Sequence, residues 1–484
     1  MKAKILIGTA VLLTALCPHL TGCSQTDKEY QYIRILETTY SFLGSDNEPK
    51  VIRIEASPEW TAKSSSSWIY ISDQTENSLT ITVQDNDSDT EREGKIMLAA
   101  GNAYAEIFIS QLPQRYDLPI YNTYGSYDMG AAMSPDGHYC VGTFHELQED
   151  GSYMQTPTFF DLHTGDITKV GPIHNSLFKL EKPMAVTNQG TAFIIDANGG
   201  TVAITVDGDT FKPQAPEGWK QNAHVQGVSE DGRIWVGYAC EKPGVSNRPV
   251  MWIDGQPQPL EMPETSVRGG LSNYCLARGC SSDGSIIYGT QWEDLTCGMV
   301  YWVDGKLKRV GEDIFKRETV MIENGKGNLM EYNIVTYISS LAQLNRISPN
   351  GKWIAGEYTE ETLGPDNQVN IFTCPAFYNT ETETTTVFRD YGGCGVSTVT
   401  DDGIGIITNT NYGPTSGFMV DIESGTKLQD CLSWIKDNMG ITVTSGYISR
   451  FATDGKTVLG NMPVESAGLG LQFTQFSVSP RPEE

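Results

Sequence analysis

Aromatic and cationic side chains stand in irregular stretches of the last two thirds of the chain, and their types suit sugar binding. Sugars present flat apolar C–H faces ringed by hydroxyl groups, so exposed aromatic rings flanked by polar side chains are the expected partners. The candidate residues are Trp219, His224, Arg268, Tyr274, Trp292 and Tyr332. The alternative is that these side chains fold back and pack their own segments.

Long segments of low regularity carry most of these candidates, and binding residues are common in such segments. The five longest span 144–157, 213–224, 262–276, 311–342 and 357–374, and Trp292 lies in a shorter one. We expect them to be loops on one face of the molecule.

Sequence motifs for catalysis or metal binding are missing. The five histidines after residue 22 form no HxxxH or HExxH pair, and no cysteine cluster has zinc spacing. No GxSxG elbow, phosphate-binding loop or GxGxxG after a strand is present. We therefore expect no metal site and no cofactor. Paired carboxylates for glycoside cleavage are set by space, so a hydrolase or lyase stays open.

A recurring ten-residue phrase organises the segments between these candidates. At 228–237 it reads VSEDGRIWVG, and versions of it stand at 133–142, 186–195, 280–289, 347–356, 399–408 and 451–460. The central glycines are spaced by 53, 42, 52, 67, 52 and 52 residues. Asp-Gly between two apolar runs is typical of a β-hairpin, and a period near 50 indicates a propeller.

The phrases predict seven blades of four short antiparallel strands each. Only one strand-like run, 471–478, follows the last phrase, so the seventh blade lacks an outer strand. We expect the segment 116–121, just before the first phrase, to pair with that run and close the ring, since closure removes an exposed edge.

Arg346 and Arg450 are further candidates because each stands directly before a copy of the phrase. The residue five before the central glycine is small in four repeats, but it is arginine in the fifth and the seventh. An arginine on an innermost strand either points into the central channel or pairs with an acid. The sequence leaves both open.

The repeats resemble the extracellular repeats of the HAF type and the blades of TolB-like propellers. The motifs behind this resemblance are Ser134-Pro135-Asp136-Gly137 and the Trp-Ile/Val-Asp-Gly runs that begin at Trp252 and Trp302. The resemblance spans about 116–480, and it implies a β-propeller.

Residues 31–114 do not match the repeat, and their short strand-like runs predict a small immunoglobulin-like β-sandwich. They resemble the BACON domain of Bacteroidetes proteins, a family whose name implies association with carbohydrate. The matching residues are Trp60, Trp68, Val83, Arg92, Gly94, Ile96, Ile107 and Gln111. The two tryptophans are either ligand contacts or buried core.

The first 22 residues predict a targeting segment, with Lys2 and Lys4 before a short apolar run. The run ends in Leu-Thr-Gly-Cys23, which resembles a bacterial lipobox, so Cys23 is the expected site of lipidation. Residues 23–30 are a polar tether. Lipid on Cys23 would be the chain's only attachment to a membrane, because no other stretch is long and apolar enough to span one.

The balance of charge is strongly acidic, with 34 Lys and Arg against 60 Asp and Glu. Such a balance argues against nucleic acid as a partner. Eight cysteines follow Cys23, and an exported chain permits disulfides. We expect a mixture of free and bonded thiols, with Cys275 and Cys297 as the bonded pair.

The sequence thus predicts an all-β protein made of a sandwich (31–114) and a seven-bladed propeller (115–484). The favoured function is glycan binding by a lipoprotein exposed on the outer membrane of a Bacteroidetes-like bacterium. A protein-interaction scaffold in a cell-envelope complex and a propeller hydrolase or lyase are the alternatives.

Overall fold

The computed structural model describes most of the chain between residues 31 and 479. The gaps are 36, 45–46, 87, 89–90, 113–119, 125–131, 148–152, 172–173, 177–182, 196–199, 221, 242–246, 273, 294–295, 325, 341–345, 410–415 and 467–469. The predicted leader, tether and lipidated Cys23 lie outside the described residues. Among the described residues, no helix has the length and apolarity of a membrane-crossing segment.

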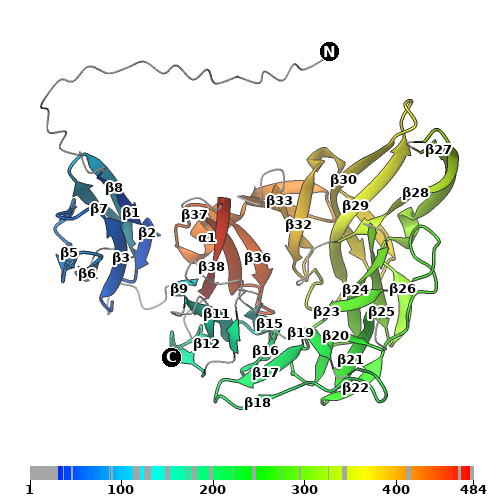
Figure 1. Ribbon diagram of the computed structural model, residues 1–484, viewed down its shortest axis with the longest axis horizontal. Helices are drawn as coiled ribbons and strands as arrows, with labels where there is room; N and C mark the ends of the chain where they lie inside the picture. The colour runs from blue at the N-terminus through cyan, green and yellow to red at the C-terminus, as the bar shows by residue number, and fades with distance from the viewer. Residues whose placement is uncertain are drawn as a thin grey trace, which may run out of the picture.

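The N-terminal part is a β-sandwich of two four-stranded sheets, ordered β1-β3-β6-β5 and β2-β8-β7-β4 (Figure 1). Its strands are β1 (Ile33–Ile35), β2 (Thr39–Phe42), β3 (Lys50–Ala56), β4 (Thr61–Ser64), β5 (Ile69–Ser72), β6 (Ser78–Val83), β7 (Arg92–Ala100) and β8 (Ala103–Gln111). Alternating apolar residues such as Ile52, Ile54, Ile107 and Ile109 turn inward and fill one core.

Two residues that the sequence analysis singled out lie in the interior of the sandwich and not on its surface. Trp60 is buried in the core and donates from Nε1 to the carbonyl oxygen of Glu76 at 2.8 Å. Gln111 is fully buried, donates to the carbonyl oxygens of Leu43 and Gln84, and accepts from Arg92. For Trp60 the buried-core alternative is therefore the correct one.

A series of antiparallel sheets follows. The first contains β10 (Ala132–Met133), β11 (Tyr139–Leu147), β12 (Tyr153–Asp161), β13 (Ile167–Lys169) and β14 (His174–Ser176). The second contains β15 (Pro183–Val186), β16 (Thr191–Ile195), β17 (Thr201–Thr205) and β18 (Thr210–Phe211). The third contains β19 (Ala223–Val228), β20 (Ile234–Cys240), β21 (Asn247–Ile253) and β22 (Gln256–Pro259).

The fourth and fifth repeats share one larger sheet, joined through a bridge between Gly298 and Ser339. Its strands are β23 (Cys275–Cys280), β24 (Ile286–Glu293), β25 (Thr296–Val303), β26 (Lys306–Arg309), β27 (Lys316–Glu323), β28 (Leu329–Ser339), β29 (Trp353–Leu363), β30 (Val369–Asn379) and β31 (Thr384–Val387). The innermost strand of the fifth repeat is reduced to a bridge between Ile347 and Ile354.

Three of the five segments predicted as long loops contain strand hairpins instead. The β27–β28 hairpin lies within 311–342, β29 and β30 extend through 357–374, and β11 and β12 extend into 144–157. The long segments are polar enough to resemble loops, but their cross-strand pairing supplies the backbone hydrogen bonds.

The sheet of the sixth repeat contains β32 (Cys394–Val399), β33 (Ile404–Asn409), β34 (Gly417–Asp421) and β35 (Thr426–Asp430). Helix α1 (Cys431–Met439) follows, capped by Asp430, whose Oδ1 accepts from the backbone N–H of Ser433 at 2.8 Å. Two short 3-10 helices occur at Glu312–Ile314 and Arg389–Tyr391.

The last sheet has the order β36-β37-β38-β9, which joins the chain's last strand to one that precedes the first repeat. Its strands are β36 (Tyr447–Phe451), β37 (Val458–Ser466), β38 (Gly470–Ser479) and β9 (Ile120–Tyr124). The pairing of a strand before the first phrase with the last strand is as predicted, but the paired strand begins at Ile120. Residues 116–119 of the predicted strand lie outside the described residues.

The repeated phrase builds the same turn each time. In the third repeat the Ser229 hydroxyl donates to Asp231 Oδ1 at 2.6 Å, and the backbone N–H of Ile234 donates back to the Ser229 hydroxyl at 3.0 Å. All seven central glycines have φ between 65° and 82°, a conformation that side chains disfavour. The phrase is therefore a hairpin-turn signal, as predicted.

Neighbouring sheets contact one another in chain order, and the last sheet lies beside the first (Figure 1). Met133 and Cys140 of the first sheet share a core with Ala452 and Leu459 of the last. The backbone N–H of Thr453 donates to the carbonyl oxygen of Pro135 at 2.7 Å. The molecule is all-β and propeller-like.

Deleting Ile120–Tyr124 should strongly lower the melting temperature or cause aggregation, because β38 would then expose an unpaired edge. Thermal unfolding followed by circular dichroism checks this. A chain lacking residues 480–484 is the control of equal length. Equal melting of the β9 deletion and the control would mean that the β9–β38 pairing contributes nothing to stability.

Candidate functional site

Four rings gather where the third and fourth repeats meet, at the edge opposite the Asp-Gly turns, and we call them the aromatic cluster. His224 stands at the start of β19, Tyr238 near the end of β20, Tyr274 just before β23 and Trp292 near the end of β24. The His224 and Tyr238 rings stack with centroids 4.4 Å apart. The Tyr274 and Trp292 rings meet edge to face at 6.3 Å.

Strand pairing fixes these rings. His224 lies opposite Tyr238 in the β19–β20 ladder, and the backbone N–H of Trp292 donates to the carbonyl oxygen of Tyr274 at 3.0 Å. Asn247, the first residue of β21, donates from Nδ2 to the Tyr274 hydroxyl at 3.1 Å. The cluster is therefore held by rigid strands.

Polar groups accompany the rings. The indole N–H of Trp292 is buried and has no hydrogen-bond partner among the described residues, so it is a donor available to a ligand or to water. Arg278 lies beneath, buried, and donates to Thr290 Oγ1 at 3.1 Å and to Gln226 Oε1 at 3.3 Å. Burial raises the pKa of the Tyr238 hydroxyl, and the charge of Arg278 opposes that rise.

The cluster offers partly exposed faces and few charges. Tyr238, Tyr274 and Trp292 are half-buried, whereas His224 is buried, with 9% of its surface exposed. An arrangement of aromatic faces with an amide and an indole N–H suits a neutral polar ligand with apolar faces.

Trp219, a predicted site residue, does not join the cluster. It is half-buried against a core that includes Phe193, Val250 and Trp252. For this residue the packing alternative describes the structure better than the binding one.

Arg268 and Tyr332 come together, but as a structural unit. Arg268 binds both carboxylate oxygens of Glu361, and its Nη1 also donates to the carbonyl oxygen of Asn333 at 2.7 Å. The guanidinium lies 4.7 Å from the centre of the Tyr332 ring. The Glu361 side chain is only 2% exposed, so Arg268 neutralises a buried charge.

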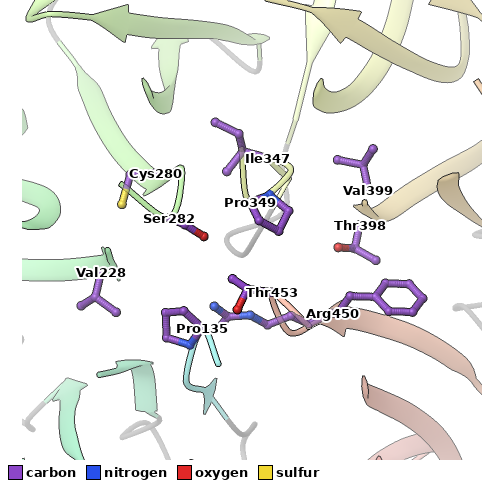
Figure 2. Close-up of a pocket in the computed structure, with 11 residues that line it drawn as sticks. Pro135, Val228, Cys280, Ser282, Ile347, Pro349, Thr398, Val399, Arg450 and Thr453 are labelled. Carbon is purple, nitrogen blue, oxygen red and sulfur yellow. The ribbon is translucent and has the colours of Figure 1, made fainter. Parts of the chain in front are cut away.

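Arg346 and Arg450 differ from each other, and each follows one of the two predicted alternatives. Arg346 is buried and pairs with Glu357 at 2.7 Å between Nη1 and Oε1. Arg450 extends into a cavity on the inner ends of several repeats and donates from Nη1 to the carbonyl oxygen of Met133 (Figure 2). Burial lowers the pKa of Arg450 to about 10, so it remains charged at neutral pH.

The cavity around Arg450 is too small for a sugar. Its volume is about 40 Å³, and its lining includes Pro135, Cys280, Pro349 and Thr453 (Figure 2). A space of that size holds one or a few water-sized molecules. Arg450 therefore does not belong to a glycan site of this kind.

Sequence reasoning missed Tyr238, Asn247 and Arg278, which lie in strands β20, β21 and β23 and belong to no motif. It also missed a group formed by His138, Asp161 and His163, whose ligand-type atoms all lie within 4.8 Å of one another. His138 and Asp161 are 23 residues apart and meet only because β11 pairs with β12. The sequence therefore carried no signal for this group, and the expectation of no metal site stays a prediction.

The expected Cys275–Cys297 bond is wrong, because neither cysteine is in a disulfide. Both thiols are buried within strands, and Cys297 Sγ donates to the carbonyl oxygen of Ser340 at 2.7 Å. Burial raises the pKa of the Cys297 thiol to about 11. Such thiols behave as small apolar side chains.

Comparison with known families and structures agrees with part of this picture. Residues 59–112 match the BACON family model, described as a putative N-terminal binding domain, and this confirms the predicted resemblance for that part. No curated protein matches the chain.

Several solved structures are similar to it. The oligogalacturonate lyase of Vibrio parahaemolyticus is 11% identical over 81% of this chain and 97% of that one, with a TM-score of 0.41. The β-propeller domain of the Trilobed protease from Pyrococcus furiosus is 12% identical over 75% and 98%, with a TM-score of 0.36. A Bacteroides ovatus GH5 xyloglucanase, solved with a XXXG heptasaccharide, is 24% identical over 25% of this chain, with a TM-score of 0.17. The chain spans only 30% of that xyloglucanase's length.

Arg268→Ala should lower the free energy of unfolding by about 3–5 kcal/mol, because it leaves the Glu361 carboxylate buried without its partner. Arg389→Ala is the matched control, since Arg389 pairs with Glu360 of the same strand but is 55% exposed. That variant should cost about 1 kcal/mol or less. Urea unfolding measures both, and similar losses would contradict a structural role special to Arg268.

Proposed function

We propose that this protein is a carbohydrate-binding lipoprotein of a bacterial cell surface, and that the aromatic cluster is its ligand site. The observation that carries the proposal is the convergence of Tyr238, Tyr274 and Trp292 at one edge, with the buried and unpartnered indole N–H of Trp292. Aromatic rings on rigid strands supply contact area at little entropic cost.

The polar groups of the cluster complement hydroxyl-rich ligands. The Asn247 amide and the Tyr274 hydroxyl are linked by a hydrogen bond, so one side of the edge-to-face pair is polar. A sugar ring lying on the face of Trp292 would offer hydroxyls to this polar side. The propeller-like part, which forms the binding head, would thus bind a glycan. The strongly acidic chain makes nucleic acid an unsuitable partner.

The seven phrases support a seven-bladed propeller closed by the β9–β38 pairing. The sandwich would be an immunoglobulin-like spacer of the BACON type, between that head and a lipid on Cys23. We propose the outer membrane of a Bacteroidetes-like bacterium as the location, with the head facing outward.

A protein-interaction scaffold in a cell-envelope complex is the second candidate. It is supported by apolar side chains exposed on the β27–β28 and β29–β30 hairpins, which project at one end of the molecule (Figure 1). The exposed residues are Met321, Leu329, Met330, Ile371 and Phe372. Exposed apolar side chains of this kind favour protein contacts.

Trp292→Ala and Tyr274→Ala should each weaken polysaccharide binding by about 1–3 kcal/mol, the scale of one lost well-packed side-chain contact. Isothermal titration of the full chain in detergent, against a panel of neutral and acidic polysaccharides, measures this. Their melting temperatures should change little.

Two other variants control this test. Tyr104→Ala removes a ring that is 69% exposed on the sandwich, and it should leave binding unchanged if the site is the aromatic cluster. Trp219→Ala should lower the melting temperature but preserve binding. If no polysaccharide binds the unmutated chain at millimolar concentration, the carbohydrate proposal fails and the scaffold takes its place.

Cys23→Ala should move the protein out of the membrane fraction or leave the leader uncleaved, because the acylated side chain would be lost. Cell fractionation and the mass of the N-terminal peptide test this, with Ser24→Ala as the neighbouring control. Unchanged fractionation and mass in the Cys23 variant would disprove lipid anchoring.

A further inference from the structure

His138, Asp161 and His163 form a compact group on the first sheet, separate from the aromatic cluster of the third and fourth. Their imidazole and carboxylate atoms lie within 4.8 Å of one another, and His138 Nε2 is 3.0 Å from Asp161 Oδ2. The His138 and His163 rings face each other with centroids 4.6 Å apart. All three side chains are half-buried, so solutes can reach them.

We propose that His138, Asp161 and His163 hold a divalent transition-metal ion of the Zn²⁺ class. Two imidazoles and one carboxylate match the ligands that such ions take, in contrast to the all-oxygen sets preferred by Ca²⁺ and Mg²⁺. Three protein ligands around a tetrahedral ion leave the fourth position open to water or to another ligand.

The fold holds two of the three ligands in place. His138 directly follows the Asp-Gly turn of the first repeat, and its backbone N–H donates to Asp136 Oδ1 at 2.9 Å. Its ring also stacks on Tyr139 at 4.1 Å. Asp161 ends β12, and its Oδ1 accepts from the backbone N–H groups of His163 and Thr164 at 2.9 and 3.0 Å.

Because Oδ1 of Asp161 accepts the two backbone hydrogen bonds, Oδ2 is left to contact His138 Nε2. Outer hydrogen bonds of this kind orient the carboxylates that bind metals. One oxygen of Asp161 therefore maintains the turn while the other faces the group. A single residue both shapes the β12–β13 turn and supplies a metal ligand.

The third ligand must move slightly. The His138 and His163 rings are nearly parallel, at 6°, and one ion cannot lie in both ring planes. A tetrahedral ion with bonds of about 2.0–2.1 Å to nitrogen draws its ligand atoms to roughly 3.3 Å apart. His163 lies in a turn beside exposed Thr164 and Gly165, so its ring can tilt toward His138 without disturbing a strand.

Titration of the full chain, freed of metal by EDTA and carrying no histidine tag, with ZnCl₂ tests the proposal. We expect a single saturable site and a rise in melting temperature with Zn²⁺. His163→Gln and Asp161→Asn should each weaken Zn²⁺ binding by about ten-fold or more. The Asn variant keeps an oxygen that can accept the two backbone hydrogen bonds, so the turn should persist.

Asp166→Asn is the matched control, because Asp166 is an exposed acid of the same turn outside the group. It should bind Zn²⁺ as the unmutated chain does. Co²⁺ as a second probe should give the intense visible absorption of a four-coordinate ion. The proposal is overturned if the unmutated chain shows no saturable Zn²⁺ binding, or if both ligand variants retain it while circular dichroism shows them folded.

Discussion

The hydrogen-bonded Ser-x-Asp-Gly turn is the constraint on which the repeated sheets depend. Each turn joins the first two strands of its sheet, and several turns also form hydrogen bonds with one another. The backbone N–H of Glu230 donates to Ser282, and the N–H of Ser282 donates to Pro349. Thr453 Oγ1 even reaches Glu230 Oε1 at 3.4 Å, from the last repeat to the third. The inner ends are consequently crowded, and several of them line the small cavity around Arg450.

That crowding explains why small residues stand directly before most copies of the phrase. It also places the structural contacts at one edge of the sheets and the candidate binding residues at the other. A Cβ on Gly227 would lie 2.8 Å from the Cα of Gly279, so neighbouring innermost strands approach closely there. Where arginine stands at this position instead, it pairs with Glu357 or fills the cavity. The aromatic cluster lies at the opposite edge of the sheets, away from these close approaches.

The sequence predicted the turns and the sandwich core because both depend on local residue patterns. It also predicted that the last strand pairs with one before the repeats, because an unpaired edge needs a partner. The aromatic cluster could be predicted only in part. His224, Tyr274 and Trp292 stood out by residue type, but Tyr238 joins them through the register of β20 against β19. Arg268 also stood out, yet its partner Glu361 is 93 residues away. Contacts of this kind depend on cross-strand register, which residue spacing does not encode.

The short connection between the sandwich and β9 also limits where the sandwich can lie. Leu112, just beyond the last sandwich strand, is buried in the core formed by α1 and the last sheet, and Thr442 donates to Glu91 at 3.2 Å. Seven residues lie between Leu112 and Ile120, so eight residue steps span at most about 28 Å. Because β9 must join the last sheet, the sandwich has to pack beside that sheet. The first and second sheets lie between the last sheet and the third, so the sandwich stands away from the aromatic cluster (Figure 1).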